Sequence, residues 1–331
     1  RRTRGRAIKS QFPRHAARRG HQRARRAIPR YRPQTAKTGG LLPHWRQPPR
    51  CIGALGVSAE CELVRPCPVC DGRSSALLFE RNGYGVHSCD ACSGVFVGRD
   101  PASIDFHGLY GEDYYTGGHA EVFADYLGEE VARRAHARRK LWLLRHLPPR
   151  LPRAGRLLDV GCAAGFFLAE ARASYEVQGV ELSEWSSAHA RDRLGLPVVT
   201  GTLQQAAFPA DHFDVITLWD VIEHVPDPVP LLAEAARVLR RGGRLVLTTG
   251  DWGSAYARRR GADWHLIAPP WHLTMFSRAT MALAGERAGL KVVHCASEGV
   301  AGDGPFWRHR VGLFLARLFD SGDIMRMSFT R

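Results

Sequence analysis

Acidic residues are absent from the first 59 positions of this 331-residue chain, and no apolar run long enough to cross a membrane occurs anywhere in it. Without such a run, a transmembrane helix is not expected. Residues 1–59 also lack the apolar core of a secretory signal. Eight cysteines are too few for a disulfide scaffold in a chain of this length. These absences predict a cytoplasmic protein that does not bind a membrane.

The basic charge of the chain is confined to its leader, residues 1–59. The leader contains 16 Lys and Arg, whereas residues 60–331 contain 31 basic and 32 acidic side chains. We expect the leader to be disordered, because it has too little apolar surface to fold. Three interpretations of it remain: a nucleic-acid contact through phosphates, an organelle-targeting peptide, or an extension without function.

Two Cys-x-x-Cys pairs follow the leader. Cys67 and Cys70 form the first pair, Cys89 and Cys92 form the second, and 18 residues separate the pairs. This spacing is typical of a four-cysteine zinc site, in which four thiolates fill the tetrahedral shell and leave no position for water. The sequence therefore predicts a structural Zn²⁺. A redox dithiol is the alternative function, and His87 is an alternative ligand.

From Arg156 onward, short apolar runs alternate with helical patterns, which is typical of βαβ units and a parallel sheet. The expected strands are 156–161, 175–182, 196–201, 213–219, 243–250, 290–297 and 323–331. The expected helices are 121–147, 166–173, 184–195 and 227–243.

A loop of small residues joins the first strand to its helix. A dinucleotide-binding fingerprint would place glycines at positions 161, 163 and 166, but the chain has Gly161, Ala163 and Phe166 there. The segment from Asp159 to Gly165 instead resembles the Asp/Glu-x-Gly-x-Gly-x-Gly loop of class I S-adenosylmethionine-dependent methyltransferases.

Further elements extend this resemblance over residues 155–250. Glu181 ends the second strand, 22 residues after Asp159, and "LWDVIEHVPDP" follows the fourth strand at 218–228. The latter motif and "WHLIAPPWHLTMFS" at 264–277 resemble a small-molecule subgroup akin to the ubiquinone-biosynthesis O-methyltransferases. The resemblance implies a Rossmann-like α/β fold with a seven-stranded, mostly parallel sheet, helices on both faces, and a small N-terminal zinc ribbon.

The resemblance also implies where S-adenosylmethionine binds. Glu181 is expected to accept the two ribose hydroxyls. Thr202 stands where the family often has an acid for the adenine amino group, so this contact departs from the pattern. The complete expected cofactor set is Asp159, Gly161, Cys162, Gly165, Glu181, Leu182, Thr202, Leu203 and Trp219.

Methyl transfer to a hydroxyl requires alignment of the acceptor and removal of its proton. His224 follows the fourth strand, where the cleft of such a sheet opens, and is the first candidate for the general base. Its alternative role is to hold the following turn. His272 and Asp220 are further candidates, and an acceptor carbon or stronger nucleophile needs no base. Tyr114 and Tyr115 are expected either to cover the pocket or to pack structurally.

The predicted organisation has four parts: the leader (1–59), a zinc ribbon (60–100), a connector with a helical cap (101–154) and the methyltransferase domain (155–331). The predicted function is methyl transfer to a small-molecule acceptor. A nucleic-acid methyltransferase and a non-catalytic cofactor-binding protein are the alternatives. The neutral body and the absence of an Asn/Asp-Pro-Pro-Tyr/Phe motif disfavour nucleic acid. The sequence does not predict an oligomeric state.

Overall fold

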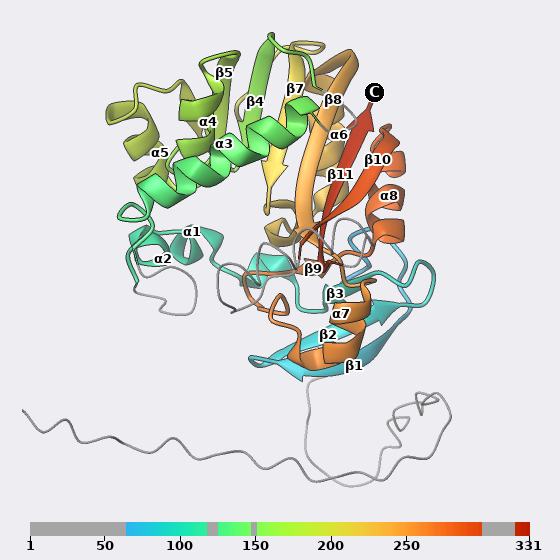
Figure 1. Ribbon diagram of the computed structural model, residues 1–331. Helices are drawn as coiled ribbons and strands as arrows, with labels where there is room; N and C mark the ends of the chain where they lie inside the picture. The colour runs from blue at the N-terminus through green and yellow to red at the C-terminus, as the bar shows by residue number, and fades with distance from the viewer. Residues whose placement is uncertain (1–63, 118–124, 147–150, 300–321) are drawn as a thin grey trace, which may run out of the picture. The chain divides into compact units, whose positions relative to one another are not determined.

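A computed structural model describes residues 64–117, 125–146, 151–299 and 322–331 (Figure 1). The chain divides into two units after Ile52, and all of the described residues belong to the second unit, Gly53–Arg331. The predictions for the leader and for the first residues of helix 121–147 lie outside the described residues.

The central sheet has seven strands in the order β10-β11-β8-β7-β4-β5-β6. The strands from β8 to β6 pair in parallel, and β11 is antiparallel to both of its neighbours. This topology confirms the predicted Rossmann-like sheet. The bounds are β4 (Arg156–Val160), β5 (Glu176–Glu181), β6 (Val198–Thr200), β7 (Phe213–Trp219), β8 (Leu239–Gly250), β10 (Lys291–Gly299) and β11 (Ile324–Thr330).

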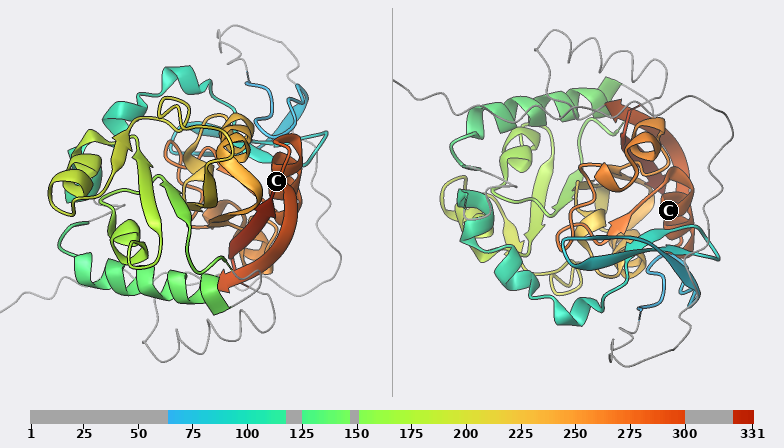
Figure 2. Two further views of the ribbon diagram at one scale, coloured as in Figure 1. Left: turned by 90° about the horizontal axis from the view of Figure 1, so that it is seen from above. Right: turned by 90° about the horizontal axis from the view of Figure 1, so that it is seen from below.

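Helices cover both faces of this sheet, because successive apolar residues of a buried strand point to opposite faces. Leu157 packs in one core cluster with α3, α4 and α5, whereas Leu158 packs in another with α6 and α8. The two helix layers are seen from above and below in Figure 2. The bounds are α3 (Glu130–His146), α4 (Phe166–Ala171), α5 (Glu184–Asp192), α6 (Pro228–Val238) and α8 (Arg278–Arg287).

Two predicted helix bounds are wrong. The helix expected at 227–243 ends at Val238, and the chain is extended from Leu239 onward because the fully buried Leu239 pairs with Phe213 of β7. The helix expected at 121–147 begins only at Glu130, since residues 125–129 form turns. Tertiary pairing with β7 overrides the local helix periodicity at Leu239.

The segment with the paired cysteines forms an antiparallel sheet that recruits a distant strand. Its order is β1-β2-β3-β9. The first three strands, β1 (Ser75–Arg81), β2 (Tyr84–Cys89) and β3 (Val95–Val97), come from the expected ribbon, but β9 (Thr274–Met275) comes from the loop after β8. In Figure 1 this small sheet lies beyond the lower ends of the central strands. The pairing with β9 was not predicted from the sequence.

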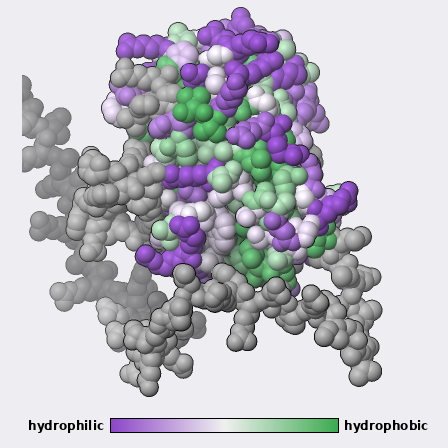
Figure 3. Space-filling model, turned by 90° about the vertical axis from the view of Figure 1, so that its right-hand side faces the viewer, coloured by the Kyte–Doolittle hydropathy of each residue, from purple (hydrophilic) through white to green (hydrophobic). Residues whose placement is uncertain are grey.

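The remaining described elements are short. They are the 3-10 helices η1 (Pro101–Ser103), η2 (Ile222–His224) and η3 (Gly261–Asp263), and the helices α1 (Phe106–Leu109), α2 (Glu112–Thr116) and α7 (Ala255–Arg260). None of the helices in the described ranges combines the length and apolarity that a membrane crossing requires. Figure 3 shows apolar and polar side chains intermixed over the side of the molecule on the right of Figure 1.

Candidate functional site

The loop between β4 and α4 is a sharp turn built on left-handed residues. Gly161, Ala163 and Gly165 have φ angles of +73°, +46° and +82°. A Cβ atom on Gly161 would lie 2.5 Å from Val221 Cγ2, and one on Gly165 would lie 2.6 Å from Leu196 Cδ1. Both positions therefore require glycine, for conformation and for close approach. The loop opens at the carboxyl edge of the sheet, where α/β proteins bind ligands.

Asp159 is buried just before this loop. Thr217 Oγ1 of β7 donates a hydrogen bond to Asp159 Oδ1 at 2.6 Å. Burial raises the pKa of Asp159 to about 7, and the Thr217 bond and the Lys140 charge only partly oppose this shift. The observed contact of Asp159 is thus with the neighbouring strand, and its role toward a cofactor stays a prediction.

Glu181 joins the glycine loop to the end of β5. Its Oε2 accepts a hydrogen bond from the amide of Ala163 at 2.8 Å, and its Oε1 accepts one from the amide of Ser183 at 2.8 Å. Burial raises the pKa of Glu181, although these amide bonds lower it. Each carboxylate oxygen has a second lone pair. The side chain can therefore hold the loop and still accept a bond from a ligand hydroxyl.

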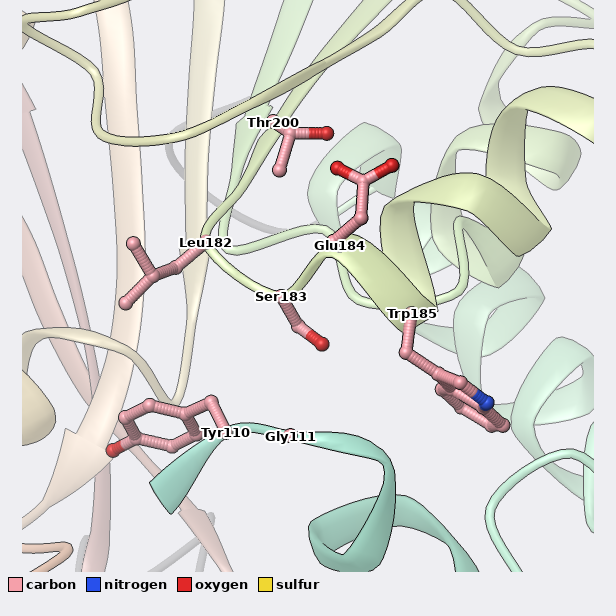
Figure 4. Close-up of a pocket in the computed structure, with 7 residues that line it drawn as sticks. All are labelled: Tyr110, Gly111, Leu182, Ser183, Glu184, Trp185 and Thr200. Atoms are coloured by element: carbon pink, nitrogen blue, oxygen red, sulfur yellow. The ribbon is translucent and has the colours of Figure 1, made fainter. Parts of the chain in front are cut away.

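A pocket of about 290 Å³ lies at the turn that follows Glu181 in the chain (Figure 4). Three segments supply its walls: the turn from β5 into α5, the end of β6, and the connector between α1 and α2. The lining residues are Tyr110, Gly111, Leu182, Ser183, Glu184, Trp185 and Thr200. Of the expected cofactor set, Leu182 lines this pocket directly.

The other expected cofactor residues do not line this pocket. Thr202 Oγ1 accepts a hydrogen bond from the amide of Gln205 at 3.2 Å, so its hydroxyl is engaged in a local turn. Leu203 and Cys162 are buried in the apolar core clusters. Trp219 ends β7, and its ring contacts Phe167 with the centroids 5.2 Å apart. The structure does not test their cofactor roles.

Aromatic rings from the connector cover the carboxyl edge of the sheet. Tyr115 stacks on Trp185 with the centroids 5.2 Å apart and contacts Tyr114 at 5.0 Å and Tyr126 at 5.3 Å. Tyr114 contacts Tyr110 at 5.1 Å. Burial raises the pKa of Tyr114 and of Tyr115, so both phenols stay protonated. Tyr110 and Trp185 of this cluster line the pocket, whereas Tyr114 and Tyr115 pack against them, so a covering role of Tyr114 and Tyr115 stays a prediction.

The two histidines predicted from separate motifs meet in space. The rings of His224 and His272 contact each other with the centroids 4.6 Å apart. His224 Nδ1 lies 2.9 Å from the carbonyl oxygen of Trp271 and 3.0 Å from the hydroxyl of Tyr110. His272 Nδ1 lies 2.6 Å from the carbonyl oxygen of Leu266. A carbonyl only accepts, so each Nδ1 carries the proton and each Nε2 has a free lone pair.

Burial keeps both rings neutral. It lowers the pKa of His224 to about 3, with a smaller contribution from His272, and it also lowers the pKa of His272. Glu223 lies beside them, and burial together with the Asp220 charge raises its pKa to about 8. One carboxylate oxygen of Glu223 and one nitrogen of each ring lie within 4.8 Å of one another. This trio can move a proton, and its donor set can also hold a divalent cation.

Asp220 lies at the edge of this cluster. Its Oδ1 accepts a hydrogen bond from Thr248 Oγ1 at 2.8 Å, and its Oδ2 lies 3.8 Å from Lys140 Nζ. Lys140 also lies over the ring of Trp219, at 4.4 Å from the centroid. The carboxylate is thus paired with a cation and affects Glu223 by its charge.

The four predicted zinc ligands converge. Cys67 Sγ lies 3.6 Å from Cys92 Sγ, and Cys70 Sγ lies 3.5 Å from Cys89 Sγ. Sulfurs around a tetrahedral Zn²⁺ are ~3.8 Å apart, given Zn–S bonds of ~2.3 Å. Among the described residues, the candidate metal-binding group consists of the four cysteines and does not include His87. The cluster therefore fits Zn²⁺, which the four thiolates would hold in a closed, structural site.

Sequence reasoning missed several residues of the site. Ser183, Glu184 and Trp185 directly follow the predicted Glu181 and Leu182, so their position in the chain was an available signal. Tyr110 and Gly111 carried no such signal, because only the tertiary path of the connector brings them to β5. Glu223 directly precedes the predicted His224, but its place in the cluster depends on His272 from a distant loop.

Comparison with known proteins shows which domain family the chain resembles. A family model described as a methyltransferase domain matches residues 131–295. A ubiquinone biosynthesis O-methyltransferase of Thiobacillus denitrificans is 39% identical over 116 residues, which are 32% of this chain and 49% of that relative. A phosphatidylethanolamine N-methyltransferase of Cereibacter sphaeroides is 32% identical over 116 residues, which are 33% of this chain and 55% of that relative.

The chain spans about half the length of the curated relatives it matches. Among solved structures, a SAM-dependent methyltransferase from Archaeoglobus fulgidus aligns with 69% of this chain and 100% of its own, at 17% identity and a TM-score of 0.46.

Proposed function

Residues 131–295 form a class I S-adenosylmethionine-dependent methyltransferase domain, and from this premise we propose that the chain transfers the methyl group of S-adenosylmethionine to a small-molecule hydroxyl, with His224 as the base. The observation that carries the proposal is the carboxylate of Glu181, which is bonded to the glycine loop and directly precedes the pocket-lining residues Leu182–Trp185. An acid at this place suits a ribose diol, because it accepts two hydroxyl bonds at once.

Each expected cofactor residue has its own role in binding S-adenosylmethionine. Glu181 binds the ribose hydroxyls, and Leu182 supplies an apolar wall for the adenine. Gly161 and Gly165 let the loop approach the ligand closely, and Asp159 holds that loop to β7 through Thr217. The remaining residues, at the edges of this region, are Cys162, Thr202, Leu203 and Trp219. When bound, the cofactor supplies a sulfonium methyl group that is transferred in an in-line displacement.

His224 is suited to accept the proton of a hydroxyl acceptor. Its Nδ1–H donates to the Trp271 carbonyl, which leaves the Nε2 lone pair for the substrate. Burial keeps the ring neutral before reaction. Burial lowers the pKa of the neighbouring His272, but the Asp220 charge raises it in opposition and so favours a proton on this histidine pair. His272, which contacts His224, orients the ring or shares the proton.

The similarity to ubiquinone biosynthesis O-methyltransferases favours a small-molecule acceptor. The pocket of about 290 Å³ at Leu182 is assigned here to the cofactor, with Tyr110 and Trp185 in its wall. The relatives named above act on oxygen in one case and nitrogen in the other. We favour oxygen because a hydroxyl needs the base that His224 offers, whereas a free amine does not.

Calorimetric titration of S-adenosylhomocysteine into the zinc-loaded protein tests this proposal. We expect micromolar binding by the unaltered chain and at least tenfold weaker binding by the Glu181→Gln variant. Glu176→Gln is the matched control, because Glu176 begins the same strand and is exposed. Its affinity should stay within twofold of the unaltered protein. Absence of binding by folded protein would contradict the proposed function.

A further inference from the structure

The two loops that carry the histidines both bind the four-cysteine module, which is defined here as residues 64–98. The first loop runs from Asp220 to Asp227 and contains His224. Arg65 Nη2 donates a hydrogen bond to the Pro226 carbonyl at 2.8 Å and lies 3.0 Å from Asp227 Oδ1. The Arg65 side chain is only 10% exposed. Arg65 lies two residues before Cys67, and its amide donates to the Gly98 carbonyl at 2.9 Å, so its backbone is bonded within the module.

The second loop, residues 264–277, contains His272 and is held at two places. Asn82, at the turn between β1 and β2, donates from Nδ2 to the Pro269 carbonyl at 2.9 Å. Farther along the loop, the amide of Val97 in β3 donates to the Leu273 carbonyl at 2.9 Å, and β3 pairs with β9. The β1–β2 turn and β3 of the module therefore bond the loop on both sides of His272, at Pro269 and at Leu273.

Leu273 connects the two loops to each other. Its carbonyl accepts from Val97 of the four-cysteine module, and its amide donates to the Glu223 carbonyl at 2.8 Å. His272 and His224 are the direct neighbours of these two residues in the sequence. A displacement of β3 would therefore move both histidines.

We propose that the four-cysteine module is the positioning element of the acceptor site: with Zn²⁺ bound, Arg65, Asn82 and β3 hold the two histidine loops in the arrangement that brings His224 and His272 together. The inference rests on the proposed function, because it takes these histidines as the acceptor-side groups. Arg65 and Asn82 touch neither histidine and act through the loops, so they are positioning residues. A small module of this kind needs its metal in order to keep such geometry.

Asn82→Gly is the sharpest test. Asn82 and Gly83 have φ angles of +51° and +77°, a conformation that glycine adopts freely, so the turn survives while the bond to Pro269 is lost. Arg65→Met removes the anchor of the other loop. Ser74→Ala is the control, since Ser74 bonds Asp90 within the module and contacts neither loop.

The readouts are the hydrogen-exchange rate of the Leu273 amide and the ¹⁵N NMR signature of the ring nitrogens in the zinc-loaded full chain. We expect at least tenfold faster exchange at Leu273 and loss of the single Nδ1–H tautomer of His272 in Asn82→Gly. Arg65→Met should affect His224 in the same way. Zinc content and S-adenosylhomocysteine affinity should stay within twofold, and Ser74→Ala should change nothing.

Unchanged exchange and tautomers in Asn82→Gly, with zinc retained, would overturn the proposal and leave the module a purely structural appendage. If Arg65→Met releases its zinc, Asn82→Gly decides the question alone. The proposed function fails separately, through absence of S-adenosylhomocysteine binding by the unaltered chain, and the histidine readouts do not depend on that result.

Discussion

Several residues at the carboxyl edge of the sheet have shifted pKa values or a left-handed backbone conformation. Asp159 and Glu223 are buried acids with raised pKa values, and His224 is a buried base with a lowered one. Gly161 adopts a left-handed conformation against Val221. Such groups reduce stability and cluster at functional sites.

Asp159→Asn should make stability less dependent on pH. The pKa of Asp159 is raised from 3.8 to about 7, so the folded protein binds a proton that the unfolded chain has already released between these values. The folded state of the unaltered protein therefore loses stability as pH rises from 4 to 7, by up to about 1.4 kcal/mol per pH unit. Asn keeps an acceptor for Thr217 but does not titrate.

Urea denaturation at pH 5 and at pH 7.5 measures this effect. The free energy of unfolding of Asp159→Asn, relative to the unaltered protein, should be higher at pH 7.5 than at pH 5. An equal difference at the two pH values would show that Asp159 titrates normally.

Gly161→Ala should destabilise the fold by about 1–3 kcal/mol, because the added methyl meets Val221 Cγ2 and the residue has a positive φ. The urea midpoint measures this loss. Gly195→Ala is the control, since Gly195 has a similar φ of +61° but no atom within 4 Å of the added Cβ. Gly161→Ala should be the more damaging of the two.

At the scale of elements, helix ends and strand pairings set the path of the loops. The helix α8 begins right after the 264–277 loop, and Ser277 caps it: the amide of Thr280 donates to Ser277 Oγ at 3.2 Å, and Thr280 Oγ1 accepts from the amide of Ser277 at 2.9 Å. This capping box fixes where the loop ends.

Ser277→Ala should lower the free energy of unfolding by about 1 kcal/mol, because one capping bond of α8 is lost. Ser277→Thr keeps a hydroxyl at the cap and should restore most of this stability. Denaturant unfolding of the two variants gives the comparison. Equal losses would indicate that the cap contributes nothing and that the effect comes from packing.

At the scale of the whole molecule, the four-cysteine module and the central sheet share one core. Cys67, Val69, Cys89 and Phe96 lie in the same apolar cluster as residues of β4, β7 and α6. The small sheet also includes β9, which lies far from β1–β3 in the sequence. The two parts are therefore expected to unfold together.

Zinc removal should shift one cooperative thermal transition to lower temperature and should not create a second transition. The unaltered protein should contain about one Zn²⁺ per chain by elemental analysis, and Cys70→Ser should bind less. Cys295→Ser is the control, because Cys295 lies in β10 and does not belong to the four-cysteine group; the zinc content of this variant should stay the same. Two separate transitions in calorimetry would contradict the shared core.

Much of this molecule follows from its sequence. Short, nearly continuous apolar runs such as 213–219 and helical periodicity determined the sheet and most of its helices, because a strand buried on both faces needs apolar residues at successive positions. The spacing of four cysteines determined a group that fits zinc, and Gly161 and Gly165 stand where a tight turn allows no other residue. These features depend on neighbours in the sequence.

Contacts between distant segments were decided only by the tertiary structure. The pairing of β3 with β9, the meeting of His224 with His272, and the approach of Tyr110 to the pocket all join residues that lie far apart in the chain. The pKa values of Asp159, Glu223 and His224 depend on burial that these contacts create. Local propensity determined which helices and strands form. Long-range packing decided which of them contact one another, because such packing depends on the shape of the whole core.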